Sequence, residues 1–246
     1  MLDLPQRITK PRQKGLTAIH DVYLTVDQLK STLRDFGDFL DVAKFGVGTA
    51  YVSKNLDEKL SIYKDHGVVP YFGGTLFEKF FIQNKLEEYL EFIDEHKVTT
   101  LEVSTGTVDI PLQERIDLVN KLSKKYTVLT EVGSKDADAI MSPTEWITEI
   151  NALMEAGAKY VITEGRNSGT AGIYRPSGEM RTGLIEEIIN NCEIDRVIFE
   201  APTPKSQMHF INRIGSDVNL GNVDPEDLLL LETQRLGLRS ETFDLV

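Results

Sequence analysis

The stretch that decides the fold is TVLTEVGSKDADAIMSPTEWITEINALMEAGAKYVITE, residues Thr127–Glu164. It begins and ends with short runs of valine, isoleucine, leucine and threonine, which are typical of buried strands. Between these runs, Ser142-Pro143 is typical of a helix start and Gly157 of a helix end. The stretch therefore predicts two parallel strands joined by a helix.

The same alternation extends in both directions along the chain. We expect strands at residues Leu16–His20, Phe39–Phe45, Val68–Phe72, Thr100–Ser104, Thr127–Val132, Tyr160–Glu164, Arg196–Glu200 and Asp217–Leu220. We expect helices at residues Thr25–Phe36, Asp57–His66, Leu76–His96, Pro111–Lys124, Ser142–Ala156, Arg181–Asn191, Lys205–Ile214 and Asp224–Leu236. Eight such units predict a (β/α)₈ TIM barrel, formed as a single domain by residues 1–246.

A doubly wound open sheet is the alternative architecture. Such a sheet usually has a glycine-rich phosphate turn after its first strand. In this chain the corresponding turn reads HDVY, residues His20–Tyr23, and contains no glycine. The turn therefore favours the barrel.

Composition and charge exclude several classes of protein. The formal net charge is -12, which argues against nucleic acid or an anionic membrane as the main partner, because both need a basic surface. No apolar run reaches the length of a membrane-spanning helix. The single cysteine, Cys192, cannot form an internal disulfide, and the N-terminal residues are polar. We expect a cytoplasmic protein, and the sequence leaves open whether it forms a homo-oligomer.

Three of the expected strands end in glutamate with the same spacing. Glu131, Glu164 and Glu200 follow VLT, VIT and VIF, and Glu102 lies in a variant of the pattern, TLEVS. In a barrel, the carboxyl ends of the strands carry the active site, so these side chains should converge there. Converging carboxylates cannot all stay ionised without a cation or a shared proton, and Mg²⁺ is the expected cation because it prefers oxygen ligands. The alternative is that lysine or arginine partners pair with the glutamates at the top of the barrel.

Several basic residues and glycines are expected near the same end. Lys44 closes a strand, Lys135 and Arg166 each follow one, and Arg12 precedes the first. A lysine inside a strand is costly to bury without an anionic partner, so Lys44 is the least surface-like of these residues. The glycine-rich loop Gly165–Gly178 has the features of a lid that closes over a substrate, or of an ordered surface excursion.

Longer motifs resemble a known family along nearly the whole chain. They are KPR at Lys10–Arg12, KFGVGTA at Lys44–Ala50, YFGGTLFEK at Tyr71–Lys79, EVGSKDAD at Glu131–Asp138, EAGAKYVITEGRNSGTAGIY at Glu155–Tyr174, IFEAP at Ile198–Pro202, VNLGNV at Val218–Val223 and LETQRLGLRSET at Leu231–Thr242. Together they resemble the phosphosulfolactate synthases. Plant heat-stress-associated proteins share the same barrel and many of these motifs.

The resemblance implies a Mg²⁺-dependent lyase that adds sulfite to phosphoenolpyruvate, a step in coenzyme M or sulfolactate biosynthesis. Lys135 matches the family's proposed proton donor. Arg166, Lys44, Arg12 and the Gly221-Asn222 turn are expected to bind the anionic substrates, and Glu131, Glu164 and Glu200 the metal. The chain departs from the family at Val47, where a tryptophan is usual, and at residues 165, 167 and 175 in and beside the expected lid.

Two other functions stay open at this point. One is a different Mg²⁺-dependent lyase that acts on phosphoenolpyruvate or an oxo-acid with the same carboxylates but another nucleophile. The other is a non-catalytic, stress-related interaction protein like the plant relatives. Retention of Lys135, Arg166 and the strand-end glutamates argues against the second, because an interaction role needs none of them inside a barrel.

Overall fold

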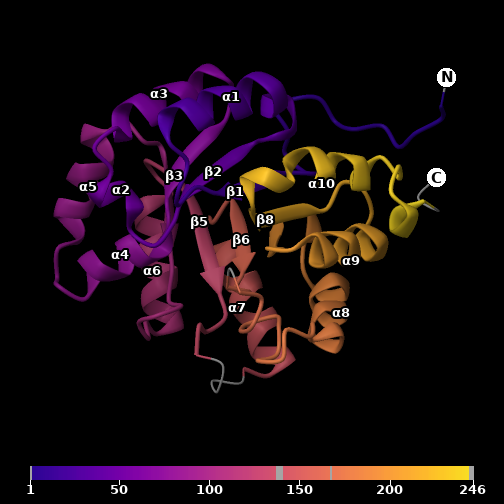
Figure 1. Cartoon of the computed structure of the whole chain (residues 1–246). Coiled ribbons are helices and arrows are strands. Elements are labelled where there is room, and N and C mark those ends of the chain that lie inside the picture. The colour runs from indigo at the N-terminus through magenta and orange to yellow at the C-terminus, as the bar shows by residue number, and fades with distance from the viewer. Residues whose placement is uncertain (1, 137–140, 167, 244–246) are drawn as a thin grey trace.

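The computed structural model describes residues 2–136, 141–166 and 168–243. Its eight strands form a closed parallel barrel in which each strand pairs with the next and β8 pairs with β1 (Figure 1). The strands are β1 (Thr17–His20), β2 (Val42–Phe45), β3 (Val69–Phe72), β4 (Thr100–Val103), β5 (Thr127–Val132), β6 (Tyr160–Thr163), β7 (Val197–Glu200) and β8 (Asn219–Val223). The predicted TIM barrel is confirmed, and the open sheet is excluded.

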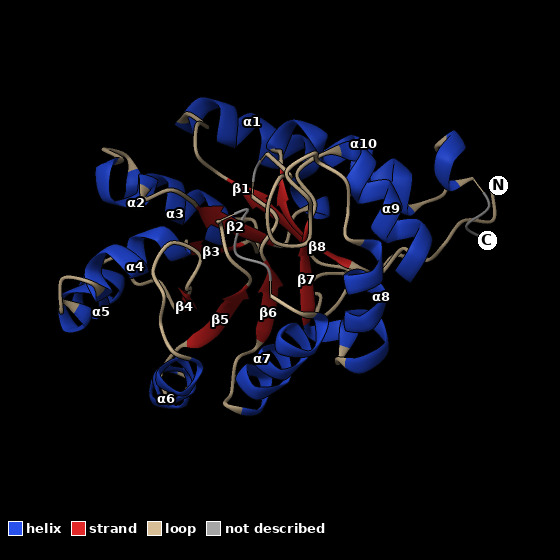
Figure 2. Ribbon diagram, turned by 90° about the horizontal axis from the view of Figure 1, so that it is seen from below, coloured by secondary structure: helices blue, strands red, loops and turns tan. Residues whose placement is uncertain are grey.

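Helices surround the strands on the outside (Figure 2). They are α1 (Val26–Phe36), α2 (Thr49–Val52), α3 (Leu56–Asp65), α4 (Gly74–Phe81), α5 (Leu86–Glu95), α6 (Leu112–Leu122), α7 (Pro143–Glu155), α8 (Thr182–Asn191), α9 (Pro204–Ile214) and α10 (Leu228–Arg235). The Ser142 side chain caps α7 by accepting a hydrogen bond from the backbone N–H of Glu145, as its place before Pro143 predicts. Within the described ranges, no helix is both long enough and apolar enough to cross a bilayer.

The structure corrects two expected elements. The single helix expected from Leu76 to His96 is two helices, α4 and α5, because Asn84 adopts a left-handed conformation with φ 56° and turns the chain between them. The last strand lies further along the chain than expected. Gly221 and Asn222 therefore belong to β8 itself and not to a turn after it.

The apolar core has two parts. The larger part lies between the barrel and its helices and includes Phe45, Phe77, Trp146 and Phe199, all nearly inaccessible to solvent. The smaller part fills the inside of the barrel. Its buried members are Leu16, Tyr71, Leu129, Tyr160, Ile162 and Ile198, with Val42 packed against them.

The inner apolar layer lies directly beneath a charged layer. Side chains alternate across a strand, so residues two positions apart share a face. On three strands, an apolar residue of the inner layer is followed on the same face by a charged residue nearer the carboxyl end. These pairs are Val42 and Lys44 on β2, Leu129 and Glu131 on β5, and Ile198 and Glu200 on β7. The barrel therefore carries its charges toward the carboxyl ends of its strands.

Candidate active site

A cavity of about 330 Å³ opens at the carboxyl ends of the strands. Its lining residues are His20, Lys44, Val47, Gly74, Thr75, Glu131, Lys135, Glu164, Arg166, Ser168, Glu200 and Asn222. Seven of the residues predicted from the sequence therefore meet in one place, although they come from five different strands and the loops after them. This end of the barrel is where TIM-barrel enzymes carry their active sites.

Lys44 lies at the centre of a cluster of buried carboxylates. Its Nζ lies 3.3 Å from Glu102 Oε2, 3.4 Å from Glu131 Oε2 and 3.5 Å from Glu200 Oε1. Burial alone would lower the pKa of Lys44, but the carboxylates, Glu102 foremost, raise it well above its ordinary value. Lys44 is therefore a permanent cation in the floor of the cavity.

Glu102 is part of this cluster although the sequence set it apart from the other three glutamates. It lies one position before the end of β4, is inaccessible to solvent, and accepts a hydrogen bond from the Gly74 N–H at 2.9 Å. A Cβ on Gly74 would lie 2.3 Å from Glu102 Oε1, so glycine is required at this position. The TLEVS variant of the strand pattern was the signal for its role. Burial raises the pKa of Glu102 to about 7.

Lys135 enters the same cavity from the loop after β5. Its Nζ lies 3.3 Å from Glu131 Oε1 and 3.7 Å from Glu164 Oε2. Burial lowers the pKa of Lys135, but the charges of Glu131 and then Glu164 raise it overall, so Lys135 is protonated at neutral pH. Burial likewise raises the pKa of Glu131, but Lys135 and Lys44 lower it overall, so Glu131 is ionised.

Glu164 and Glu200 complete the carboxylate cluster. Glu200 Oε2 accepts a hydrogen bond from the Gly165 N–H at 2.8 Å, and Glu164 Oε1 accepts one from the Arg166 N–H at 2.7 Å. Glu164 Oε2 is buried and accepts no hydrogen bond. Burial, followed by the charge of Glu131, raises the pKa of Glu164 well above its ordinary value. The cluster thus has more carboxylates than its two lysines neutralise.

The carboxylates of this cluster fit Mg²⁺ as one or two ligands, but they do not surround a metal ion completely. Among the described residues, no three aspartate, glutamate, histidine or cysteine side chains are grouped closely enough to hold a metal ion. Lys44 and Lys135 lie among the glutamates and pair with them, which is what the alternative to a metal site predicted. However, Mg²⁺ usually takes only one or two protein carboxylates and completes its shell with water and substrate oxygens. Glu164, whose Oε2 has no hydrogen bond and lies 3.7 Å from Lys135 Nζ, and the neighbouring Glu131 or Glu200 fit that requirement.

Arg166 lines the cavity from the loop after β6, three residues beyond the end of the strand. It adopts a left-handed conformation with φ 54° and is exposed. Within the described ranges, its guanidinium has no hydrogen bond or ion pair, so its donors are available to a ligand. Arg166 is therefore one of the predicted residues that line the cavity wall.

The middle of the loop after β6, at residues 171–174, is packed against the barrel. A Cβ on Gly172 would lie 1.9 Å from the backbone oxygen of Glu164, and Ile173 donates a hydrogen bond to that same oxygen at 2.8 Å. The buried Tyr174 hydroxyl donates to the Glu200 backbone oxygen at 2.7 Å. Gly172 is therefore packed closely against the residue that follows β6. Asn167 and residues 137–138, which fall in the matched motifs, lie outside the described residues, as do residues 139–140.

The two predicted residues of β8 differ in what they offer. Asn222 lines the cavity, has φ 52°, and its buried Oδ1 has no hydrogen-bond partner. Gly221 faces the barrel interior, where a Cβ would lie 3.0 Å from Ile198 Cγ2. Asn222 can therefore contact a ligand, whereas Gly221 provides space.

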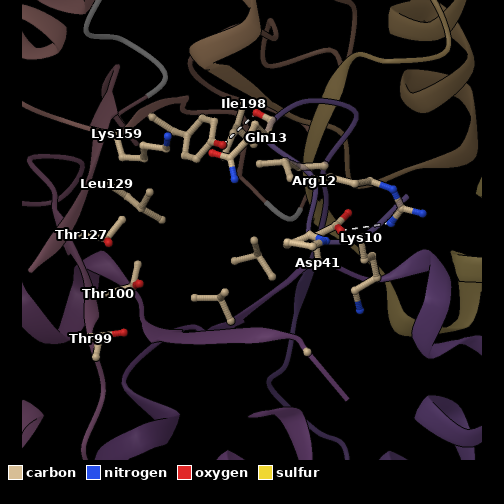
Figure 3. Close-up of a pocket in the computed structure, with 16 residues that line it drawn as sticks. Lys10, Arg12, Gln13, Asp41, Thr99, Thr100, Thr127, Leu129, Lys159 and Ile198 are labelled. Atoms are coloured by element: carbon tan, nitrogen blue, oxygen red, sulfur yellow. Dashed lines mark hydrogen bonds and ion pairs between the residues drawn. The ribbon is translucent and has the colours of Figure 1, made fainter. Parts of the chain in front are cut away.

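Arg12 is not part of this site, contrary to the sequence-based expectation. It lies at the amino-terminal end of the barrel, where it lines a different cavity (Figure 3). Its Nη1 donates to Asp41 Oδ1 at 3.0 Å, its Nη2 to the Asp38 backbone oxygen at 3.0 Å and its Nε to the Ile8 backbone oxygen at 2.6 Å. These contacts anchor the N-terminal segment to the barrel. The position of Arg12 before the first strand was the signal for this placement, because residues that precede a strand lie at the amino-terminal end of the barrel.

His20 is a residue of the site that sequence reasoning missed. It ends β1 and lines the cavity. A Cβ on Gly46 would lie 1.6 Å from His20 Nε2, so the glycine of the KFGVGTA motif makes room for the imidazole. The signal in the sequence was this glycine beside a strand end.

Comparisons with known proteins agree with this geometry. Residues 5–241 match the family model of (2R)-phospho-3-sulfolactate synthase. The phosphosulfolactate synthase of Bacillus subtilis is 42% identical over 98% of this chain and 97% of its own, and that of Methanocaldococcus jannaschii is 38% identical over 94% of each chain. The protein HEAT-STRESS-ASSOCIATED 32 of Arabidopsis thaliana is 22% identical over 93% of this chain and 88% of its own.

Solved structures show the fold alone. A 3-hexulose-6-phosphate synthase superposes with a TM-score of 0.55 at 14% identity, over 90% of this chain and 99% of its own. The match of nearly the whole sequence to one family model, and the similarity to its bacterial and archaeal members, carry the assignment. The chain belongs to the (2R)-phospho-3-sulfolactate synthase family.

Proposed function

We propose that this protein adds sulfite to phosphoenolpyruvate to form phosphosulfolactate, with Mg²⁺ as its cofactor. The observation that carries the proposal is the Lys135 ammonium group, held between two glutamates in a cavity at the carboxyl end of a barrel that matches the family throughout. A protonated lysine in that position can supply the proton that the addition requires.

The reaction needs positive charges that bind the two anionic substrates, sulfite and phosphoenolpyruvate, and a proton donor for C2 of phosphoenolpyruvate. The sulfur lone pair of sulfite forms a bond to C3 of phosphoenolpyruvate, and the C2–C3 π electrons move onto the substrate carboxylate. The Lys135 ammonium then donates its proton to C2, and the phosphate ester stays intact. Lys135 regains a proton from solvent. No group leaves, so the product contains every atom of sulfite and phosphoenolpyruvate plus one proton that comes from solvent through Lys135, and it carries one negative charge fewer than the two substrates together.

The other residues of the cavity bind and orient the substrates. Arg166 has an uncommitted guanidinium, whose planar fork can grip a carboxylate, phosphate or sulfonate by two hydrogen bonds. Lys44 supplies a fixed positive charge at the floor, and His20 and Asn222 line the wall on the side of β1 and β8. Mg²⁺ held by Glu164 and a neighbouring glutamate would stabilise the negative charge that develops on the substrate carboxylate.

The proposal is tested by following phosphoenolpyruvate consumption by the purified protein. We expect consumption only when sulfite and Mg²⁺ are both present, and we expect a chelator to stop it until Mg²⁺ is added in excess. Consumption that proceeds at the same rate without sulfite would point to another nucleophile and refute the proposal.

Replacing Arg166 with lysine should weaken the grip on the substrate anion. Lysine keeps the charge but loses the bidentate geometry. We therefore expect Arg166→Lys to lower kcat/KM by about tenfold or more, equivalent to about 1.4 kcal/mol, mainly through KM. Arg175→Lys, at an exposed position of the same loop, is the matched control and should leave the kinetics unchanged. Equal kinetics of the two variants would remove Arg166 from the site.

A further inference from the structure

A second cavity opens at the opposite, amino-terminal end of the barrel. Its volume is about 260 Å³. The first residues of several strands line one wall, among them Val69 of β3, Thr100 of β4 and Thr127 of β5. The segment Lys10–Gln13 forms its other wall (Figure 3). This cavity surface includes the KPR motif, Lys10–Arg12, but the proposed catalysis uses none of it.

The cavity is apolar at its floor and polar at its rim. Leu129, Ile198 and the ring of Tyr160 form the floor and belong to the inner apolar layer of the barrel. The Tyr160 hydroxyl already donates a hydrogen bond to the Gln13 backbone oxygen at 2.8 Å, so it leaves no unpaired polar group on the floor. The floor therefore suits the hydrophobic body of a ligand. On size alone, an apolar cavity of about 150 Å³ accepts benzene, so this larger cavity can hold a ring with a short substituent.

The rim carries an excess of positive charge in a protein whose net charge is -12. Lys10, Arg12 and Lys159 line it, and Asp41 is its acidic residue. Arg12 is occupied by Asp41 and two backbone oxygens, and the Lys10 Nζ donates to the backbone oxygens of Gly37 at 3.0 Å and His66 at 3.1 Å. These two residues therefore contribute charge but few free donors.

Lys159 is the cation that remains available. Its Nζ lies 5.6 Å from the centre of the Tyr160 ring, and within the described ranges it has no hydrogen bond or ion pair. Lys159 thus lines the cavity beside the Tyr160 ring with an ammonium group that a ligand can reach. Thr99, Thr100 and Thr127 lie on the same side of the cavity as Lys159, and their hydroxyls add polar groups to that wall (Figure 3).

We propose that this cavity is a second binding site, separate from the catalytic one, for a small organic anion with an apolar body, such as an aryl or branched-chain carboxylate. The apolar part lies on the Leu129–Ile198 floor, and the carboxylate faces Lys159 at the rim. This site does not depend on the reaction that the protein catalyses. Its floor residues lie two positions before Glu131 and Glu200 on the same strands, so a bound anion is one layer beneath the catalytic charges.

The test uses phenylacetate as the probe and the neutral phenylacetamide as its isosteric control. Binding to the full-length protein is followed by NMR of labelled valine, isoleucine, leucine and threonine methyl groups. We expect phenylacetate to shift the methyl signals of Val69, Thr100 and Ile198 and to leave those of Val47 and Thr75, in the catalytic cavity, in place. Phenylacetamide should bind more weakly by about fivefold, the upper range for one part-exposed ion pair.

Two variants and a control locate the site. Lys159→Gln should weaken phenylacetate binding by about the same factor, whereas Lys124→Gln, which removes an exposed lysine elsewhere, should not. Val69→Phe should block the mouth, and the fold should tolerate it because Val69 is 43% exposed. Absence of methyl shifts up to the solubility limit, shifts confined to Val47 and Thr75, or equal binding of the neutral probe would each overturn the proposal.

Discussion

Lys135→Ala is expected to lower kcat by about 10²-fold or more while leaving the affinity for phosphoenolpyruvate nearly unchanged, because a positioned acid contributes on that scale to the chemical step. The Lys135 ammonium group lies inside the cavity, 3.3 Å from Glu131 and 3.7 Å from Glu164, and its raised pKa keeps the proton in place at neutral pH. The measurement is steady-state kcat together with the dissociation constant of phosphoenolpyruvate by titration calorimetry.

Lys135→Arg separates proton donation from charge. Arginine keeps the ion pairs with the glutamates, but it does not give up a proton at any accessible pH. We expect this variant to bind phosphoenolpyruvate like the parent and still to lose kcat by about 10²-fold or more. If Lys135→Arg retained the parent kcat, Lys135 would act by its charge alone and another group would be the acid.

Lys44→Met is expected to be the most destabilising single change in the site. Its ammonium group lies within 3.5 Å of three buried carboxylates, and removal of one partner from a buried ion pair costs about 3–5 kcal/mol. We therefore expect the free energy of unfolding in metal-free buffer to fall by about 3 kcal/mol at about pH 8. Urea denaturation measures the loss.

The loss should depend on pH in a fixed direction. Burial raises the pKa of Glu102 from 4.5 to about 7, so this group favours the folded state fully below pH 4.5 and loses that contribution as pH rises toward 7. Without Lys44 the pKa of Glu102 rises further. The deficit of Lys44→Met relative to the parent should therefore be smaller at about pH 5 than at about pH 8.

A second substitution checks the origin of this effect. Lys44→Met combined with Glu102→Gln removes the charge that Lys44 left behind, so the double variant should regain part of the stability at the higher pH. A deficit that is equal at both pH values, together with no recovery in the double variant, would show that Lys44 stabilises the barrel by packing and not by its charge.

The fold could be predicted because each level of the sequence points the same way. The strand–helix–strand stretch Thr127–Glu164 is reproduced with β5 exactly as expected and α7 within one residue of its expected ends. The failures came where a local turn interrupts a continuing pattern. The aromatic residues of 76–96 keep a helical period through Asn84, and only its left-handed conformation divides α4 from α5.

Site residues could be predicted where the register of a strand determines which way the side chain points. They could not be predicted where the only argument was that a residue lies near a strand in the sequence. Glu131, Glu164 and Glu200 share a register, and the structure brings them to one cavity. Arg12 precedes a strand, which places it at the amino-terminal end, and its partner Asp41 lies far from it in the chain. Which carboxylates pair with Lys44 is a property of barrel closure, because Glu102, Glu131 and Glu200 come from β4, β5 and β7.

The measurement that tests the central claim most directly is ³¹P NMR of phosphoenolpyruvate, sulfite, Mg²⁺ and the purified protein, carried out in parallel in H₂O and D₂O. The account predicts one new phosphate-ester resonance in both solvents. It should be split by a proton on C2 in H₂O and lose that splitting in D₂O, because the proton on C2 comes from a solvent-exchanged lysine. Phosphoenolpyruvate that stays unchanged, or that yields only inorganic phosphate, would contradict the account.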